Sequence, residues 1–435
     1  MSGLRPIEPA DVSDQAWSTP IASAAAPASR DVRWRWLILA LLTIGVMISF
    51  IDRTSLSSAL AAPSFKRHFH LSNVDRGWIG SAFFWSYAAL QVPLGWVVDR
   101  YGVKWPYAIC FAVWCAATAA TGLVGGFAGL IAIRLLVGAA EAIVVPASWR
   151  WMRGNFAEGQ SGAAVGVFML GTKIGPAIGA PLAAWLIVKT DWRAMFWLVG
   201  AAGLAWLIPW LLFVQDKTPP RAKQVLRQAP ALSIGRLLST PLIWSTLVVN
   251  FCYNYFTFYC MTWMLAYLVE QRGLSVGRMG LYAFFSFAGI GIVALGGGWA
   301  ADRLIRRGLD PVLVRKTFTI AGFVLATSVV LGAYAHSLNW ALFWNVASLT
   351  GLGLATANHL ALCRLTLIPA SSAGVVTGLQ QVSAAMAGII APILTGWLLQ
   401  VGGSYTLPIG AIFLFLIVGA LTTAFGLRRK WSLNL

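Results

Sequence analysis

Twelve stretches of this chain stay apolar for roughly 20 residues or more, the length that a helix needs to cross the hydrocarbon core of a membrane. A backbone in that core must satisfy its own hydrogen bonds, which leaves helices or closed barrels. The composition is 58% hydrophobic and 11% charged, too little polar surface for a soluble protein of 435 residues. We therefore predict an all-α membrane protein with twelve transmembrane helices, at 35–61, 77–98, 104–124, 127–148, 161–188, 193–214, 241–268, 278–300, 316–335, 340–366, 372–399 and 405–427.

The distribution of basic residues predicts how these helices are oriented. With both termini in the cytoplasm, 21 lysine and arginine residues fall on the cytoplasmic side and seven on the outside. This bias accounts for the net charge of +18 better than a nucleic-acid partner does. Residues 1–33 are rich in Ala, Ser and Pro and lack the pattern of a signal peptide, so we expect a disordered cytoplasmic tail. A bacterial inner membrane is the expected location.

A short motif occurs twice. "GWVVDR" at 95–100 and "GWAADR" at 298–303 follow the second and the eighth predicted spans. The polar, basic segment 215–240 lies between them and reads as a cytoplasmic linker. We therefore expect two pseudo-symmetric six-helix halves, 34–214 and 241–427, followed by a short tail at 428–435. Parallel repeats of this kind are typical of transporters whose site lies between the halves.

The first copy, "GWVVDRYGVK", resembles the G-x-x-x-D-R-x-G-x-K/R loop of the major facilitator superfamily. The second copy departs from it at Ile305, where the glycine would fall. The resemblance implies a cytoplasmic gate: when the cytoplasmic side is closed, the aspartates would pair with Arg100 and Arg303 and face helix N-termini. Ordinary charged turns are the alternative. The expected gate residues are Gly95, Asp99, Arg100, Asp302 and Arg303.

Charged residues inside predicted spans are costly and usually have a partner and a task. At 1.5 Å per residue, Asp52 lies about 24 Å from the cytoplasmic start of its helix, and Arg134 about 10 Å from the outer end of the fourth. Glu141 lies two turns further along the helix of Arg134. We predict a proton-coupling track of Asp52, Arg134 and Glu141, with Asp52 turned toward Arg134; a purely structural ion-pair set is the alternative.

Four segments together resemble the anion:cation symporters, a family that transports hexuronates, aldonates and other organic acids: "FIDRTSLSSA", "FFWSYAALQVPLGWVVDRYG", "RLLVGAAEAIVVP" and "NFCYNYFTFYCMTWMLAYL". The resemblance covers residues 34–427. It implies that Asp52 and Glu141 are the proton-coupling acids, that Arg53 and Arg134 are the family's two arginines, and that Tyr87 lines the cavity.

The substrate side of the site is predicted from further polar residues. Arg53 offers a planar fork of donors for a carboxylate. Lys173 is either a second anionic anchor, which favours a dicarboxylate or an aromatic acid, or a partner of an acid such as Glu141. Asn254 and Tyr255 lie on a polar and aromatic stretch that serves either substrate binding or packing. Gln381 takes the first place of an asparagine pair found in the family.

These features predict a proton-coupled importer of a small organic anion, working as a monomer in a lipid bilayer. No cofactor other than the proton is expected, and no metal site or nucleic-acid partner. An exchanger or exporter of organic anions is the alternative. A membrane enzyme is disfavoured because no metal-spaced residue set or nucleophile motif occurs, and a transporter-like sensor because no output domain is visible.

Overall fold

The computed structural model describes the whole chain except residues 1–31, 157, 216–233, 363–366, 369–371 and 429–435. The described part is helical and contains no strand. Most of the predicted tail, most of the predicted linker, Arg364 and the end of the tenth predicted span lie outside it. The helices are α1 (Val32–Ala61), α2 (Pro63–Phe69), α3 (Asn73–Tyr101), α4 (Lys104–Ala120), η2 (Thr121–Leu123), α5 (Phe127–Glu141), α6 (Val144–Asn155), α7 (Glu158–Lys189), α8 (Trp192–Ala205), α9 (Leu207–Phe213), α11 (Ile234–Leu238), α12 (Pro241–Thr262), α13 (Met264–Glu270), α14 (Val276–Arg306), α15 (Pro311–Ala326), α16 (Val329–Tyr334), α17 (Leu338–Ala361), α18 (Ala373–Gly402) and α19 (Thr406–Gly426).

A helix or a pair of helices occupies each predicted span, and α2 is an addition that the hydropathy pattern did not predict. Nine helical segments in the described part are long and apolar enough to cross a membrane. The predicted spans outside this set correspond to α3, to α12 with α13, and to α17. These helices carry the polar side chains of Gln91, Asn250, Asn254, Asn358 and His359, which lower their hydropathy.

Proline explains two of the interruptions between paired helices. Pro146 lies in the first turn of α6 and cannot donate to the carbonyl of Ala142, where the backbone turns between α5 and α6. Pro209 has the same relation to Ala205, the last residue of α8. The first of these breaks comes directly after Glu141 and therefore ends α5 at a predicted site residue.

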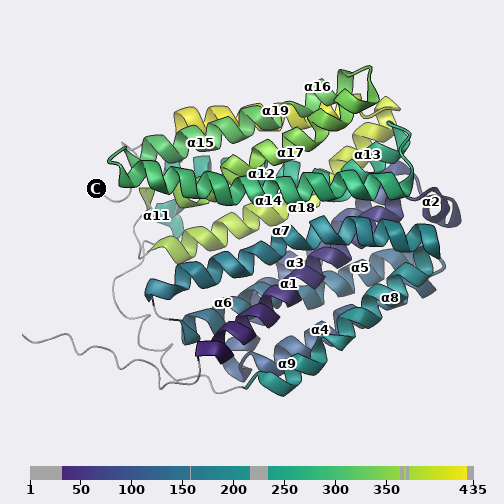
Figure 1. Cartoon of the computed structure of the whole chain (residues 1–435), viewed down its shortest axis with the longest axis horizontal. Helices are drawn as coiled ribbons and strands as arrows, with labels where there is room; N and C mark the ends of the chain where they lie inside the picture. The colour runs from purple at the N-terminus through teal and green to yellow at the C-terminus, as the bar shows by residue number, and fades with distance from the viewer. Residues whose placement is uncertain (1–31, 157, 216–233, 363–366, 369–371, 429–435) are drawn as a thin grey trace, which may run out of the picture.

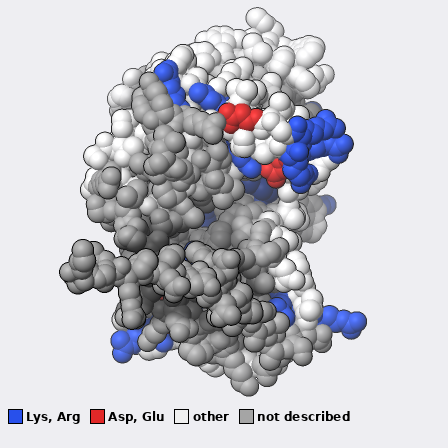
Figure 2. All heavy atoms as spheres, turned by 90° about the vertical axis from the view of Figure 1, so that its left-hand side faces the viewer, with Lys and Arg blue, Asp and Glu red and all other residues white. Residues whose placement is uncertain are grey.

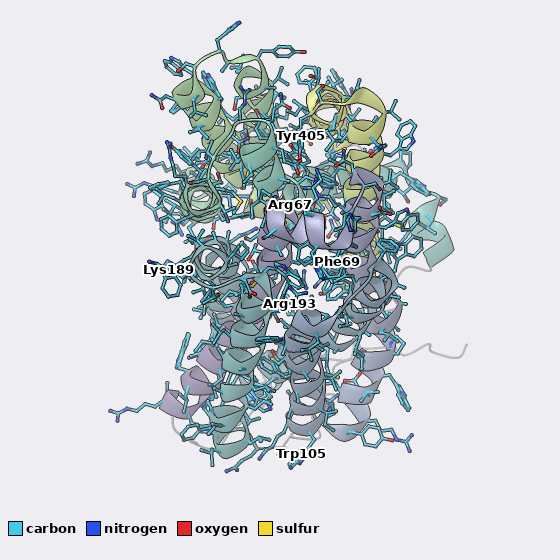
Figure 3. The ribbon with its side chains drawn as sticks, turned by 90° about the vertical axis from the view of Figure 1, so that its right-hand side faces the viewer. Arg67, Phe69, Trp105, Lys189, Arg193 and Tyr405 are labelled. Carbon is cyan, nitrogen blue, oxygen red and sulfur yellow. The ribbon has the colours of Figure 1, made fainter. Side chains whose placement is uncertain are left out.

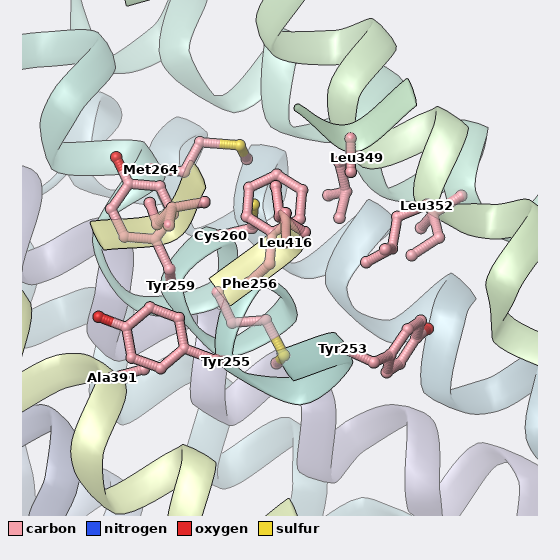
Figure 4. Packing of buried hydrophobic residues seen from close by; sticks show 14 of the residues in the cluster. Tyr253, Tyr255, Phe256, Tyr259, Cys260, Met264, Leu349, Leu352, Ala391 and Leu416 are labelled. Carbon is pink, nitrogen blue, oxygen red and sulfur yellow. The ribbon is translucent and has the colours of Figure 1, made fainter. Parts of the chain in front are cut away.

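The helices form two groups, and three hydrophobic clusters fill them: two lie mainly in the N-terminal group and one mainly in the C-terminal group. The N-terminal group comprises α1 to α9 and the C-terminal group α11 to α19. In Figure 1 the N-terminal group lies below and the C-terminal group above, and α7 and α14 run side by side between them. The C-terminal cluster is rich in aromatic rings from α12, among them Tyr253, Tyr255, Phe256 and Tyr259 (Figure 4). Contacts between α3 and α18 form the second junction of the groups.

The close approach of α7 to α1 depends on glycine. A Cβ atom on Gly175 would lie 2.7 Å from the Met47 carbonyl oxygen and 2.7 Å from the Phe50 Cβ. Gly171 and Gly179 meet α1 one turn away on either side. Small residues at such spacing let two membrane helices pack backbone against backbone.

The Gly175→Ala variant is therefore expected to lower the thermal unfolding temperature in detergent by several degrees, because overpacking costs about 1–3 kcal/mol. Gly166→Ala in the same helix is the matched control, since a Cβ there meets nothing within 4 Å. Equal unfolding temperatures for both variants would contradict the tight α1–α7 contact.

Candidate functional site

The predicted charged residues of α1 and α5 lie buried against each other. Asp52 is 2% exposed, Arg134 6% and Glu141 0%. Backbone groups within a helix bond mainly to one another, so these side chains depend on one another and on nearby hydroxyl groups. The arrangement brings two acids and two bases to one place in the N-terminal group.

Glu141 of α5 binds Arg53 of α1. Its Oε2 atom accepts hydrogen bonds from Arg53 Nη2 at 2.9 Å, from Arg53 Nε at 3.1 Å and from Ser49 Oγ at 2.7 Å. Ser49 and Arg53 are one turn apart on α1, so both face α5. In this state Arg53 therefore binds Glu141, and its role toward the substrate stays a prediction. Among the described residues Lys173 forms no ion pair with Glu141.

Asp52 and Arg134 do not form the expected ion pair. Asp52 Oδ2 accepts a hydrogen bond from Thr118 Oγ1 of α4 at 3.3 Å, while Oδ1 has no partner. Arg134 forms no ion pair in the described part of the chain, and its Nε atom has no hydrogen-bond partner. Adjacent residues of a helix point about 100° apart, which separates Asp52, facing α4, from Arg53, facing α5.

Phe83 of α3 lies against both arginines. The guanidinium carbon of Arg53 is 4.4 Å from the ring centroid of Phe83, and that of Arg134 is 5.2 Å from it. Arg53 also lies 5.2 Å from the ring of Tyr87, which stacks on Phe83. Such contacts partly compensate the burial of two like charges. Tyr87 is thus next to Arg53, and its predicted place in a substrate cavity stays a prediction.

A cavity of about 20 Å³ lies beside the two arginines, with room for about one water molecule. Both arginines contribute to its wall, together with Ser57, Phe84 and Thr262. Thr262 belongs to α12, so the cavity lies where the two groups of helices meet. This volume is too small for an organic anion.

Asn254 faces the N-terminal group from α12. It lies one turn before Phe258 and two turns before Thr262, and Phe258 contacts the ring of Phe84 at 4.5 Å between centroids. Because α3 and α12 run in opposite directions, Tyr87 and Asn254 come to similar levels, one turn beyond the Phe84–Phe258 contact. The two predicted substrate residues therefore flank the space between the groups.

The amide of Asn254 is fixed by a buried polar cluster. Its Nδ2 atom donates to the Asn250 carbonyl oxygen at 2.7 Å and to Asn250 Oδ1 at 3.3 Å. Asn250 Nδ2 in turn donates to the Gln380 carbonyl oxygen at 2.7 Å, and His359 Nε2 lies 3.4 Å from Asn250 Oδ1. These bonds leave Oδ1 of Asn254 as the atom available to a ligand.

Three other predicted substrate residues have different surroundings. Tyr255 is 0% exposed, and its ring packs on Phe415 at 4.3 Å, which fits the packing alternative. Gln381 is half-buried on α18, beside the buried Gln380. Lys173 lies opposite the α1-facing glycines of α7, and a Cβ on Gly291 of α14 would be 3.3 Å from the Lys173 Cβ. A substrate role for each of the three stays a prediction.

The predicted gate residues pair differently than expected. Asp99 binds Arg150 of α6, and Asp302 binds Arg315 of α15 at 2.9 Å. Arg100 instead lies over the rings of Trp96 and Tyr101, and Arg303 over Trp299. The pairing with Arg100 and Arg303 was expected for a closed cytoplasmic side, and in the present state Asp99 and Asp302 bind Arg150 and Arg315 instead. Gly95 of α3 lies against Pro146, and a Cβ placed on the glycine would meet Pro146 at 3.7 Å, an ordinary contact distance.

Each of these ion pairs stays within its own group of helices, the first in the N-terminal group and the second in the C-terminal group. Both lie at the end of the molecule formed by α6, α11 and the start of α15, which we call the α6 end (Figure 1). Figure 2 views this end, where lysine and arginine side chains gather on the described part of the surface around a few acidic ones. No ion pair between described residues joins the two groups there.

The opposite end, formed by α2, the end of α13 and the start of α19, holds the two groups together; we call it the α2 end (Figure 3). Glu270 of α13 binds Arg76 of α3 at 2.8 Å and Lys66 of α2 at 3.4 Å. Tyr405 donates its hydroxyl to Glu270 Oε2 at 2.8 Å. The ion pairs cross from one group to the other, so the molecule is joined at the α2 end.

Several residues of the site escaped prediction. Ser49 had a signal, since it precedes Arg53 by one turn in "SFIDRTSL". Phe83, Thr118 and Arg150 had none, because only the packing of helices distant in sequence brings them to the charges. Glu270 lies at the end of a predicted span and reads there as an ordinary loop acid.

The chain matches the model of the Major Facilitator Superfamily over residues 42–392. The chain belongs to this superfamily of transporters, as its resemblance to the family's loop motif implied, and it is not an enzyme. A solved bacterial homologue of the human lysosomal transporter Spinster, in an inward-facing and occupied conformation, superposes with a TM-score of 0.75 at 17% identity. That comparison covers 93% of this chain and 99% of the other and shows the same fold.

Curated relatives along nearly the whole chain are transporters of organic acids. The D-galactonate transporter of Escherichia coli is 26% identical, covering 90% of this chain and 97% of the relative. The hexuronate transporter of Bacillus subtilis is 29% identical, covering 88% and 91%. A probable sulfoacetate transporter of Cupriavidus necator is 28% identical, covering 91% and 94%.

Proposed function

We propose that the protein is a proton-coupled symporter that imports a small organic anion by alternating access. The observation that carries this proposal is the buried set of two acids and two arginines, in which Arg134 has no ion pair among the described residues. An unpaired buried guanidinium is costly, and an organic anion is the ligand that would compensate it. The relatives that transport galactonate, hexuronate and glucarate support a carboxylate substrate.

Protonation of Glu141 links the coupling proton to substrate binding. In this state Glu141 occupies the donor fork of Arg53. Protonation of Glu141 removes the negative charge that holds the fork, and Arg53 then becomes available to the substrate carboxylate. Asp52, with one carboxylate oxygen lacking a partner, supplies a second place for the proton. Arg134, grouped above with the acids, takes the role of an anion anchor in this scheme.

The rest of the arrangement follows the general pattern of rocking transporters. Twelve membrane spans form two halves, with both termini in the cytoplasm of a bacterial cell, and the substrate site lies between them. The α2 end then faces outward and is closed in the present state. The protein acts as a monomer with the proton as its only coupling ion. Exchange or export of organic anions is the alternative.

Uptake into proteoliposomes tests the proposal. With acid outside, the protein is expected to accumulate at least one of four acids above equilibrium: D-galactonate, D-glucarate, D-glucuronate or sulfoacetate. A protonophore should abolish that accumulation. Uptake that ignores the pH gradient but requires an internal organic anion would establish an exchanger instead. Uptake of none of the four acids under any gradient would contradict the proposed function.

A further inference from the structure

Glu270 is the acid that neutralises basic residues at the α2 end. Two other acids of this end, Asp75 and Asp191, cap helices: Asp75 forms a capping box with Ser72, and Asp191 accepts from the Ala194 backbone at 2.7 Å. Glu270 instead places its carboxylate on Arg76 and Lys66. One carboxylate thus holds two basic groups of the N-terminal group.

Arg76 forms a preformed carboxylate site. Its side chain is 1% exposed, and its guanidinium carbon lies 4.6 Å from the ring centroid of Trp263. Asn73 Oδ1 accepts from its Nη1 atom at 3.2 Å, while Nε has no partner. Lys66 is more exposed, at 40%. A buried arginine that is oriented by an amide and an indole ring, with a lysine at the rim, has the chemistry of an anion site.

The same contacts must break whenever the two groups of helices separate at this end. Glu270 and Tyr405 belong to the C-terminal group, whereas Arg76 and Lys66 belong to the N-terminal group. Separation would leave Arg76 charged, desolvated on one side and without its carboxylate. An uncompensated buried charge of this kind is strongly destabilising. A replacement carboxylate would therefore favour the separated state.

We propose that the α2 end carries an entry site for the organic anion, in which the substrate carboxylate takes the place of Glu270 on Arg76 and Lys66. The proposal rests on the proposed function, in which this end faces outward. When the groups close again, Glu270 displaces the anion from Arg76 toward the deeper arginines, Arg53 and Arg134. The acid of the protein and the acid of the substrate thus alternate on the same two bases.

The titration of Glu270 indicates that an anion, and not a proton, is what breaks the contact between Glu270 and Arg76. Burial raises the pKa of Glu270, but Arg76, the Tyr405 hydroxyl and Lys66 outweigh it and hold the pKa below its ordinary value. The ion pair is therefore fully present above the ordinary pKa of about 4.3, and it is lost only as the pH falls through the lowered value. Between pH 5 and 8 protonation does not release Arg76.

A charge swap separates an entry site from a simple latch. The Arg76→Glu/Glu270→Arg variant keeps an ion pair across the groups but places an acid beside Lys66 in the N-terminal group and moves the guanidinium to the C-terminal group, away from Lys66 and Asn73. Closure is measured by cross-linking Asn73→Cys to Gln400→Cys, since the Asn73 backbone lies 3.3 Å from the Gln400 amide oxygen. Transport is measured with the four acids named above.

For the swap we expect cross-linking within about twofold of the parent protein, together with a KM that rises at least tenfold while kcat changes little. Glu270→Gln is expected to reduce cross-linking severalfold without raising KM. A swap that transports with the parent KM would show that this end is a latch only. Absence of uptake of all four acids by the parent would contradict the proposed function itself.

A second pair of variants keeps the test valid if the swap does not fold. Lys66→Gln and Lys189→Gln remove the same charge from the same end, and only Lys66 contacts Glu270. Lys66→Gln is expected to raise KM about two- to fivefold, an effect that weakens as salt screens the approach of the anion. Equal KM values for the two variants would overturn the entry site.

Discussion

The Asp52→Asn variant is expected to lose proton-driven accumulation of substrate completely while keeping normal expression. Asparagine has nearly the same shape and can still accept the hydrogen bond of Thr118, but it cannot carry a proton on and off. Uptake by the variant should therefore stop at equilibrium, where the substrate concentrations inside and outside are equal, whereas the parent protein accumulates substrate above that level. The measurement is uptake into proteoliposomes under an imposed pH gradient.

Counterflow of labelled substrate in the same Asp52→Asn vesicles is the control, because exchange at equal concentrations does not require net proton movement. Preserved counterflow with lost accumulation would place Asp52 in coupling. Undiminished uphill uptake would remove Asp52 from the mechanism, and it would leave Glu141 as the only buried acid of the described spans available to the proton.

Arg134→Gln is expected to weaken substrate binding by about 10- to 100-fold. A hydrogen-bonded charge contributes about 1.5–3 kcal/mol, and each 1.4 kcal/mol corresponds to a factor of ten in the dissociation constant. Arg134→Lys should show a smaller loss, because the charge stays while the planar fork is lost. The dissociation constants are measured by titration calorimetry with the transported acid.

Arg307→Gln serves as the matched control for Arg134→Gln. It removes the same charge, but from an exposed position at the C-terminal end of α14. Binding by Arg134→Gln as tight as that of the control would show that Arg134 does not hold the substrate. Arg134 would then return to the role that the sequence first indicated, next to the coupling acids.

The charged residues show how much of the site could be predicted from the sequence. Asp52, Arg53, Arg134 and Glu141 stand out because each interrupts an apolar helix, where a charge is costly and seldom accidental. Their partners do not stand out. The Arg53–Glu141 pair joins residues 88 positions apart and depends on how α1 rotates against α5. Periodicity along one helix does not determine that rotation.

The gate motif illustrates the same limit. The repeat "GWVVDR" and "GWAADR" is visible in the letters, and the structure places both copies at the same end of the molecule. The partners of the aspartates come from other helices, α6 and α15, and only one of them lies near its aspartate in sequence. The motif therefore predicted the position of the charges but not their pairing.

The sequence by itself determined the all-helical membrane fold, the places of its helices and the buried charges, because the cost of moving polar groups into a bilayer depends on each segment alone. Only the tertiary structure decided which acid binds which base, which end of the molecule is closed, and that Glu270 crosses between the two groups of helices. Those contacts depend on the relative rotation and tilt of helices far apart in the chain, which are set by the packing of whole helix faces.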